Sequence, residues 1–300
     1  MPDSIHTDPE KRHDFVFLFD VTDGNPNGDP DGDNSPRFDP ETRQGLVTDV
    51  CIKRKVRDYA HEMAEAAIFI QSDKALNTRI AETAKDHGIP KPQKNERQVD
   101  PVLQGHLATG YLDIRLFGAV LSTGKAGDYN AGQVRGPIQL TFSRSIDPIL
   151  PLSVTITRQA RTNEERQKTG TTEIGRKAIV PYALYRGHGY YSPHLGTRTG
   201  VTRKDLALFW EAFARMFEYD RSAARGQMVL REAYIFTHKN PRGNAPAHKL
   251  FDLVQIQPRE HGRDEPESPA RSFSDYEMRM TVGESPAGVT LTKLTDVAWG

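Results

Sequence analysis

Cysteine is almost absent from the 300 residues: Cys51 is the only one, and no neighbour in the sequence would activate its thiol, so we expect a reduced, buried side chain. Long apolar runs are also missing. None approaches the roughly 20 residues of a membrane-spanning helix, and the N-terminus has no signal-peptide core. The sequence contains no HxxxH, CxxC or GxSxG motif, which leaves a metal hydrolase or a serine hydrolase without support. We therefore expect a cytoplasmic protein with no membrane contact, no metal and no cofactor.

An excess of charge of either sign is likewise absent, because 40 basic residues balance 40 acidic ones. The neutral total is the sum of a net acidic region and a net basic region. Residues 1–41 contain eleven acids and three bases, and residues 42–300 therefore carry 37 bases and 29 acids. A cationic groove in the second region remains compatible with the neutral total.

The best-defined stretch is residues 14–57. The apolar run from Phe15 to Val21 has strand length and predicts a strand that is buried on both faces. A segment crowded with Gly, Pro, Asn and Asp follows and predicts a loop. Helical spacing then returns, at about 100° per residue. The apolar face of this helix comprises Ile52, Val56, Tyr59, Ala60 and Met63, and three cations, Lys53, Arg54 and Arg57, lie beside it.

The remaining elements alternate in a recognisable order. A short helix is expected over 113–124, ended by Gly124, and a strong helix over 202–219, opened by Thr202 and Asp205 as a capping box. The predicted strands are 138–143, 151–157, 178–185, 228–238 and 251–257. Without insertions the order is βαββαβ, which is typical of an α+β, ferredoxin-like fold and also of RNA-recognition modules.

Residues 158–177 form a cationic arm between two predicted strands. The segment holds six bases and three acids, and Ile174 is its only large aliphatic residue. Such a segment has no core of its own, so we expect it to project from the body. Four tyrosines follow the arm and are candidates either for stacking on bases or for core packing: Tyr182, Tyr185, Tyr190 and Tyr191.

Two motifs in the chain are misleading. Asp23, Asn25, Asn27 and Gly28 open a calcium-loop pattern, but its twelfth position is Asn34 instead of a bidentate glutamate. The sequence GTTEIGRK, residues 170–177, has Arg and Lys where a phosphate-binding loop requires Lys and then Ser or Thr. We therefore expect neither calcium nor ATP at these positions, and the first segment is interpreted as a solvated, turn-forming loop.

Over residues 12–257 the chain resembles a known family. The opening segment FLFDVTDGNPNGDPDGDNSPRFDPETRQGLVTDVCIKRKVRDY is similar to the N-terminal signature of the backbone subunit of the type I-C CRISPR Cascade surveillance complex. This subunit belongs to the repeat-associated RNA-binding superfamily. The same likeness extends to DIRLFGAVL, RGPIQLTFSRSIDPI, EIGRKAIVPYALYRGHGYYS and YDRSAARGQMVLREAYIFTHKNPRGNAPAHKLFDLV.

The resemblance implies a hand-shaped, non-enzymatic subunit. It implies an RRM-like palm over 12–257, fingers within 71–135, a β-hairpin thumb at 158–177, and a C-terminal segment, 258–300, that is partly a mobile loop. Several copies would line up along a guide RNA (crRNA), bind its phosphate backbone and kink it at regular intervals, leaving the bases free to pair with target DNA. The implied partners are crRNA, target DNA, further copies of the chain, a subunit that processes the guide and holds its 5' handle, a large subunit, and a recruited helicase-nuclease.

Charge position and resemblance together give the predicted contacts to RNA. Asn25 and Asn27 would reach sugar or phosphate from the loop, and Ile174 would be the wedge beside a displaced base. The predicted cationic contacts are Lys53, Arg54, Arg57, Arg135, Arg158, Arg161, Lys168, Arg176, Lys177, Arg221 and Arg225. We expect Lys53→Glu combined with Arg57→Glu to abolish guide-length complexes while the fold survives.

Two alternatives remain open at this stage. Related backbone subunits in other CRISPR types cut RNA, so the chain could be a metal-dependent ribonuclease that uses Asp29, Asp31 or Asp33. It could also be a single-copy RNA chaperone that does not polymerise.

Overall fold

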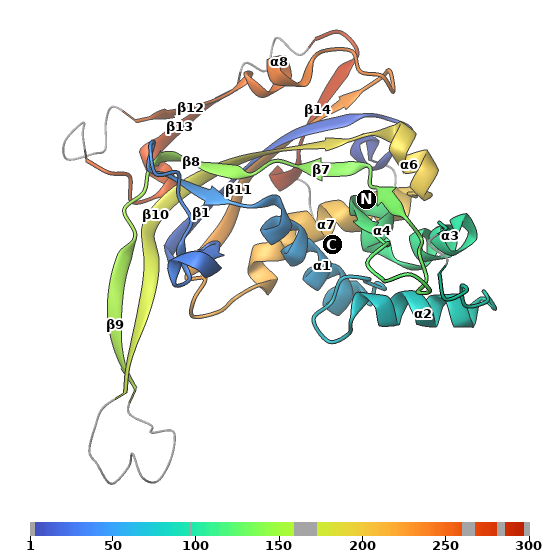
Figure 1. Cartoon of the computed structure of the whole chain (residues 1–300). Coiled ribbons are helices and arrows are strands. Elements are labelled where there is room, and N and C mark those ends of the chain that lie inside the picture. The colour runs from blue at the N-terminus through green and yellow to red at the C-terminus, as the bar shows by residue number, and fades with distance from the viewer. Residues whose placement is uncertain (1–3, 96–97, 159–172, 260–267, 281–285, 297–300) are drawn as a thin grey trace.

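The computed structural model describes residues 4–95, 98–158, 173–259, 268–280 and 286–296. It is a mixed α+β structure built on a central antiparallel sheet (Figure 1). The helices are α1 (Asp49–Ala64), α2 (Leu76–Asp86), α3 (Pro101–Gly110), α4 (Leu112–Phe117), α6 (Pro193–Thr199), α7 (Arg203–Tyr219) and α8 (Ala247–Phe251).

The sheet has the strand order β14-β11-β1-β10-β8-β4, and β7 and β9 also pair with β10. Its strands are β1 (His13–Gly24), β4 (Gln44–Val47), β7 (Ile138–Leu140), β8 (Ser143–Pro148), β9 (Leu152–Arg158), β10 (Glu173–Tyr191), β11 (Gln227–His238) and β14 (Val289–Lys293). Short pairs form elsewhere: β2 (Gly28–Asp29) with β3 (Ser35–Pro36), β5 (Gly118–Val120) with β6 (Gln133–Arg135), and β12 (Val254–Pro258) with β13 (Tyr276–Met280).

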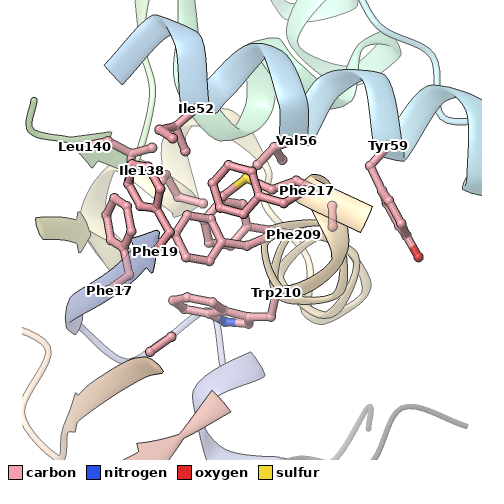
Figure 2. Packing of buried hydrophobic residues seen from close by; sticks show 14 of the residues in the cluster. Phe17, Phe19, Ile52, Val56, Tyr59, Ile138, Leu140, Phe209, Trp210 and Phe217 are labelled. Carbon is pink, nitrogen blue, oxygen red and sulfur yellow. The ribbon is translucent and has the colours of Figure 1, made fainter. Parts of the chain in front are cut away.

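Strand β1 confirms the prediction of a strand buried on both faces. Phe15, Phe17 and Phe19 point to the side covered by α1 and α7, where they pack in one cluster with Phe213 and Phe217. Figure 2 shows Ile52 and Val56 of α1 lying over the rings of Phe17, Phe19 and Phe217. On the other side Val16 and Leu18 pack against the C-terminal elements. Aromatic and β-branched residues with no polar alternation suit this position, since neither face meets water.

The two helices on the first face begin as the sequence indicates. Thr48 caps α1 by accepting a hydrogen bond from the Cys51 N–H, and Thr202 with Asp205 forms a complete capping box on α7. The predicted apolar face of α1 is wrong at one position, because Met63 is 61% exposed. Met63 lies in the last turn of the helix, past Ala60, the last buried residue of α1.

The short helix predicted to end at Gly124 ends earlier. Helix α4 stops at Phe117, and Gly118 follows with φ +77° and its α-carbon against the backbone of Val134 and Gly136. Only glycine satisfies both conditions, so the chain turns there into β5. Helices α2, α3 and α4 share a second core that includes Phe69, Leu103 and Ile114.

Strand β10 is much longer than the predicted 178–185. Its first residues, 173–179, pair with β9, and its later residues pair with β1. Gly175, Arg176 and Lys177 lack the apolar alternation that marks a strand, so only pairing with β9 identifies them. The β9–β10 ribbon extends away from the sheet (Figure 1), and Leu152, Val154 and Ile156 are exposed on it.

The C-terminal elements cover the second face of the sheet. Phe251 of α8 stacks on His188 of β10, and the β12–β13 pair packs through Tyr276 and Met278 over Leu18 and Leu184. Strand β14 pairs with β11 at the sheet edge. The predicted loop that begins at residue 258 is described only in part, because 260–267 lie outside the described residues.

Candidate nucleic-acid interface

A polar pocket of about 410 Å³ lies where three chain segments meet: the loop after β1, the first turns of α1, and the loop between α7 and β11. We call it the junction pocket. Its lining residues are Asn27, Arg37, Thr48, Val50, Cys51, Arg54, Lys55, Asp58, Asp220 and Arg225. Four of them are basic and two are acidic, so the pocket carries an excess of positive charge.

Two glycines allow the loops on either side of this pocket to touch. The α-carbon of Gly24 faces the Arg225 carbonyl, and Gly226, at φ +60°, lies against the carbonyls of Thr22 and Asp23. A β-carbon at either position would overlap the opposite backbone. The contact is completed by the Asn25 N–H, which donates to the Ala224 carbonyl at 2.8 Å.

The two loop asparagines hold the loop instead of pointing to a ligand. The Asn25 side chain is buried and donates to the Asn34 carbonyl at 2.6 Å. Asn27 Oδ1 accepts from both the N–H and the hydroxyl of Thr48, each at 2.9 Å, which ties the loop to the start of α1. These contacts differ from the predicted reach to sugar or phosphate, because Asn25 Nδ2 and Asn27 Oδ1 already bind other groups of the protein.

Arg54 and Arg225, two of the predicted RNA contacts, both line the junction pocket. The Arg54 side chain is 40% exposed, pairs with Asp58 at 3.4 Å and donates to the Ile70 carbonyl. Arg225 donates to the carbonyls of Asn25 and Pro26 and pairs with Asp220 at 3.3 Å. Both guanidinium groups therefore line the pocket on tethered side chains, which limits the entropy lost when an anion binds.

Lys53 and Arg57 do not face this pocket. Arg57 Nε pairs at 2.8 Å with Asp113 Oδ2, and the two side chains are 8% and 1% exposed. Lys53 is also buried and pairs with Asp49 one turn earlier at 2.9 Å. Both cations lie near the ring of Phe117. Their charges are thus used inside the protein, which argues against the predicted phosphate contacts at these two positions.

The other predicted cations are spread over the molecule. Lys177, at the base of the β9–β10 ribbon, donates to the Ala223 carbonyl in the loop that carries Arg225. Arg176 and Arg221 are exposed, and Arg135 is exposed on β6, in the β5–β6 pair. Arg161 and Lys168 lie outside the described residues; Arg158 and Ile174 have described backbones in β9 and β10 but no described side chains.

Sequence reasoning missed four charged residues of the junction pocket: Arg37, Lys55, Asp58 and Asp220. Arg37 is the only basic residue between positions 13 and 42, a usable signal that was overlooked. Lys55 is buried on the side of α1 that faces the α7–β11 loop, and its ammonium group contacts the Asp220 carboxylate. Burial lowers the pKa of Lys55 to about 8, and the nearby Arg225 guanidinium acts in the same direction. No sequence pattern relates Lys55 to a residue 165 positions later.

The loop aspartates form no metal centre in the described part of the chain. Asp29 caps the short turn at 30–32 and pairs with Arg37 at 3.2 Å. Among the described residues, no three side chains of His, Cys, Asp or Glu lie close enough together to hold a metal ion. This arrangement gives the ribonuclease alternative no support.

Two further expectations are settled by burial. Tyr182, Tyr185 and Tyr191 are core residues, so packing and not base stacking accounts for them. Cys51 is a free thiol, as expected, but it is only partly buried. Its Sγ lies 3.4 Å from the Pro26 carbonyl. No helix in the described ranges is long and apolar enough to cross a membrane.

Comparison with known proteins identifies the family. A protein from Haloferax volcanii, described as CRISPR-associated protein Cas7, is 29% identical over 151 residues, which are 46% of this chain and 44% of the relative. The chain thus aligns with less than half of that relative's length. Two solved chains, described as belonging to a "CRISPR RNA-guided surveillance complex, pre-nicking" and a "CRISPR RNA-guided surveillance complex", share 14% identity each. They cover 75% of this chain and 78% and 68% of their own, with TM-scores of 0.49 and 0.41. The sequence model of the family "CRISPR-associated protein Cas7" matches residues 11–281, and the chain therefore belongs to this family.

Proposed function

We propose that this chain is the repeating, guide-RNA-binding backbone subunit of a type I-C Cascade surveillance complex and that it acts without catalysing a reaction. The observation that carries the proposal is the junction pocket, where separate segments bring Arg37, Arg54, Lys55 and Arg225 to one place. Cations on a fixed frame suit phosphate, which all guide sequences share. Base-edge recognition is not needed, because the guide reads the target by base pairing.

The order of the elements supports an RRM-like palm. Strands β11, β1, β10 and β8 are neighbours, α1 follows β1, and α7 connects β10 to β11. This is the split arrangement expected for a βαββαβ chain. An RRM binds RNA on the open face of its sheet. Here α8, β12 and β13 cover that face, so we place the guide at the junction pocket beside the sheet.

The β9–β10 ribbon is our candidate for the thumb. It extends from the same side of the molecule as the α7–β11 loop, to which Lys177 is hydrogen-bonded. A ribbon rooted beside the junction pocket is well placed to bend an RNA strand that lies there. We extend the proposal to regular kinking of crRNA, to its pairing with target DNA, and to assembly with the other Cascade subunits and the helicase-nuclease in the cytoplasm.

Native mass spectrometry tests this function. The chain is co-expressed with the other complex subunits and with guides of two lengths, and we expect several copies per guide and more copies on the longer guide. One copy per guide, or none, would contradict the backbone assignment.

A charge variant tests the location of the guide. Arg54→Ala removes one cation from the junction pocket. Arg279→Ala serves as the control, because it removes an exposed cation on β13 that does not line the pocket. Only the first should weaken binding to a single-stranded RNA and reduce the salt slope, log Kd against log salt, by about 0.7. Equal slopes for both variants would rule out the junction pocket as the phosphate site.

A further inference from the structure

Asp220 occupies the position in the junction pocket where an external anion would have to bind. One carboxylate oxygen, Oδ2, contacts Lys55 Nζ and lies 3.3 Å from Arg225 Nε. The Lys55 side chain is 3% exposed, whereas that of Asp220 is 29% exposed. Lys and Arg bind phosphate in the same arrangement, in which one oxygen is shared by an ammonium and a guanidinium group.

The carboxylate is poorly placed for the helix that carries it. Asp220 is the C-terminal cap of α7, a 17-residue helix, and its N–H donates to the Met216 carbonyl. The negative end of the helix dipole disfavours an acid at this point. Lys55 and Arg225 compensate that cost, so Asp220 depends on the same two cations that a phosphate would use.

The side chain also has space to move into. Asp220 lies on the wall between the junction pocket and a second cavity of about 550 Å³, to which Arg221, Ser222 and Gly226 also contribute. Arg221 is exposed there and offers a new partner for a displaced carboxylate. Rotation from the first cavity to the second would free Lys55 and Arg225 without unfolding the loop.

We propose that Asp220 is a built-in phosphate mimic, which holds the junction pocket closed in the free chain and is displaced by a phosphate group of the guide. This inference rests on the proposed function. Because one anion replaces another, a single phosphate gains little at the pocket. A long RNA strand displaces Asp220 only because its other contacts with the protein contribute to binding. Asp220 therefore favours a long guide, which is held at many points, and disfavours short RNA.

Neutralising Asp220 tests the inference. Asp220→Asn leaves Lys55 and Arg225 free for one more phosphate, which should steepen the salt slope by about 0.7 and, at 0.1 M salt, tighten binding about fivefold. The measurement is fluorescence anisotropy of a short oligouridylate RNA with the purified chain, over a range of salt concentrations. Asp220→Glu keeps the charge and should bind as the parent does.

The matched control is Asp73→Asn. It removes the same charge from outside the junction pocket, where the Asp73 side chain is 70% exposed and pairs with Arg79. We expect less than a twofold change for this variant. Equal gains for Asp73→Asn and Asp220→Asn would refute the mimic and indicate general electrostatics.

The outcomes separate the inference from the proposed function. Failure of the parent chain to bind a guide-length RNA at any salt concentration would overturn the function itself. Binding by the parent with no gain in Asp220→Asn would overturn only the mimic. If Asp220→Asn does not fold, Asp220→Ser leaves room for water beside Lys55, and the same fivefold gain is expected; its absence would refute the inference.

Discussion

Replacing Arg57 by alanine tests whether this cation stabilises the fold instead of binding RNA. Asp113 is buried and accepts three hydrogen bonds, from Arg57 Nε at 2.8 Å and from the N–H groups of Phe69 and Ile70 at 2.7 and 3.1 Å. Without Arg57 the carboxylate keeps its two backbone donors and loses its only ion-pair partner in the described structure. A buried charge left in this way costs roughly 3–5 kcal/mol.

Because two backbone donors remain, we expect the lower end of that range, about 3 kcal/mol of unfolding free energy. For a chain of this size the melting temperature should fall by roughly 5 °C. Arg57→Glu should be worse, since it places a second carboxylate beside Asp113. The buried pair argues against the expectation that Lys53→Glu with Arg57→Glu would spare the fold. We now expect loss of guide binding in that variant to report unfolding.

Urea denaturation followed by circular dichroism is the appropriate assay. Arg54→Ala, on the same helix, removes an exposed pair and should cost less than about 1 kcal/mol. Arg57→Ala combined with Asp113→Asn should cost less than the sum of the single changes, with a coupling above about 1 kcal/mol. The reasoning is refuted if Arg57→Ala costs no more than Arg54→Ala, or if the coupling is absent.

Two further predictions concern pH and backbone geometry. Burial lowers the pKa of His6 and of His13 from 6.5 to about 4; the unfolded chain therefore binds protons first, and the unfolding free energy should fall by up to roughly 3 kcal/mol per imidazole between pH 6.5 and 4. A melting temperature that stays constant over this range would contradict the assignment. Gly226→Ala should destabilise the chain by about 1–3 kcal/mol, because φ is +60° and the β-carbon meets the carbonyls of Thr22 and Asp23. Gly105→Ala, in α3 with open space around it, should instead stabilise by about 0.5–1 kcal/mol, and equal effects in thermal melts would refute the argument.

Local sequence signals determined the elements that depend on near neighbours. Phe15 to Val21 specify a strand buried on both faces, because no polar residue alternates with the apolar ones until Asp20. Thr202 and Asp205 fix the start of α7 through hydrogen bonds only three residues apart. Long motifs were enough to indicate a CRISPR backbone family, and the match over residues 11–281 confirms it at the level of the Cas7 family.

Tertiary structure alone decided which cations are available to a ligand. Lys53, Arg54, Lys55 and Arg57 follow one another on α1, yet only Arg54 and Lys55 line the junction pocket. Arg57 is neutralised by Asp113 and Lys55 is paired with Asp220, and these partners come from elements far away in the chain. A sequence shows how many charges a segment carries. It does not show which are already compensated, since the energy of an ion pair depends on distance and burial in the folded chain.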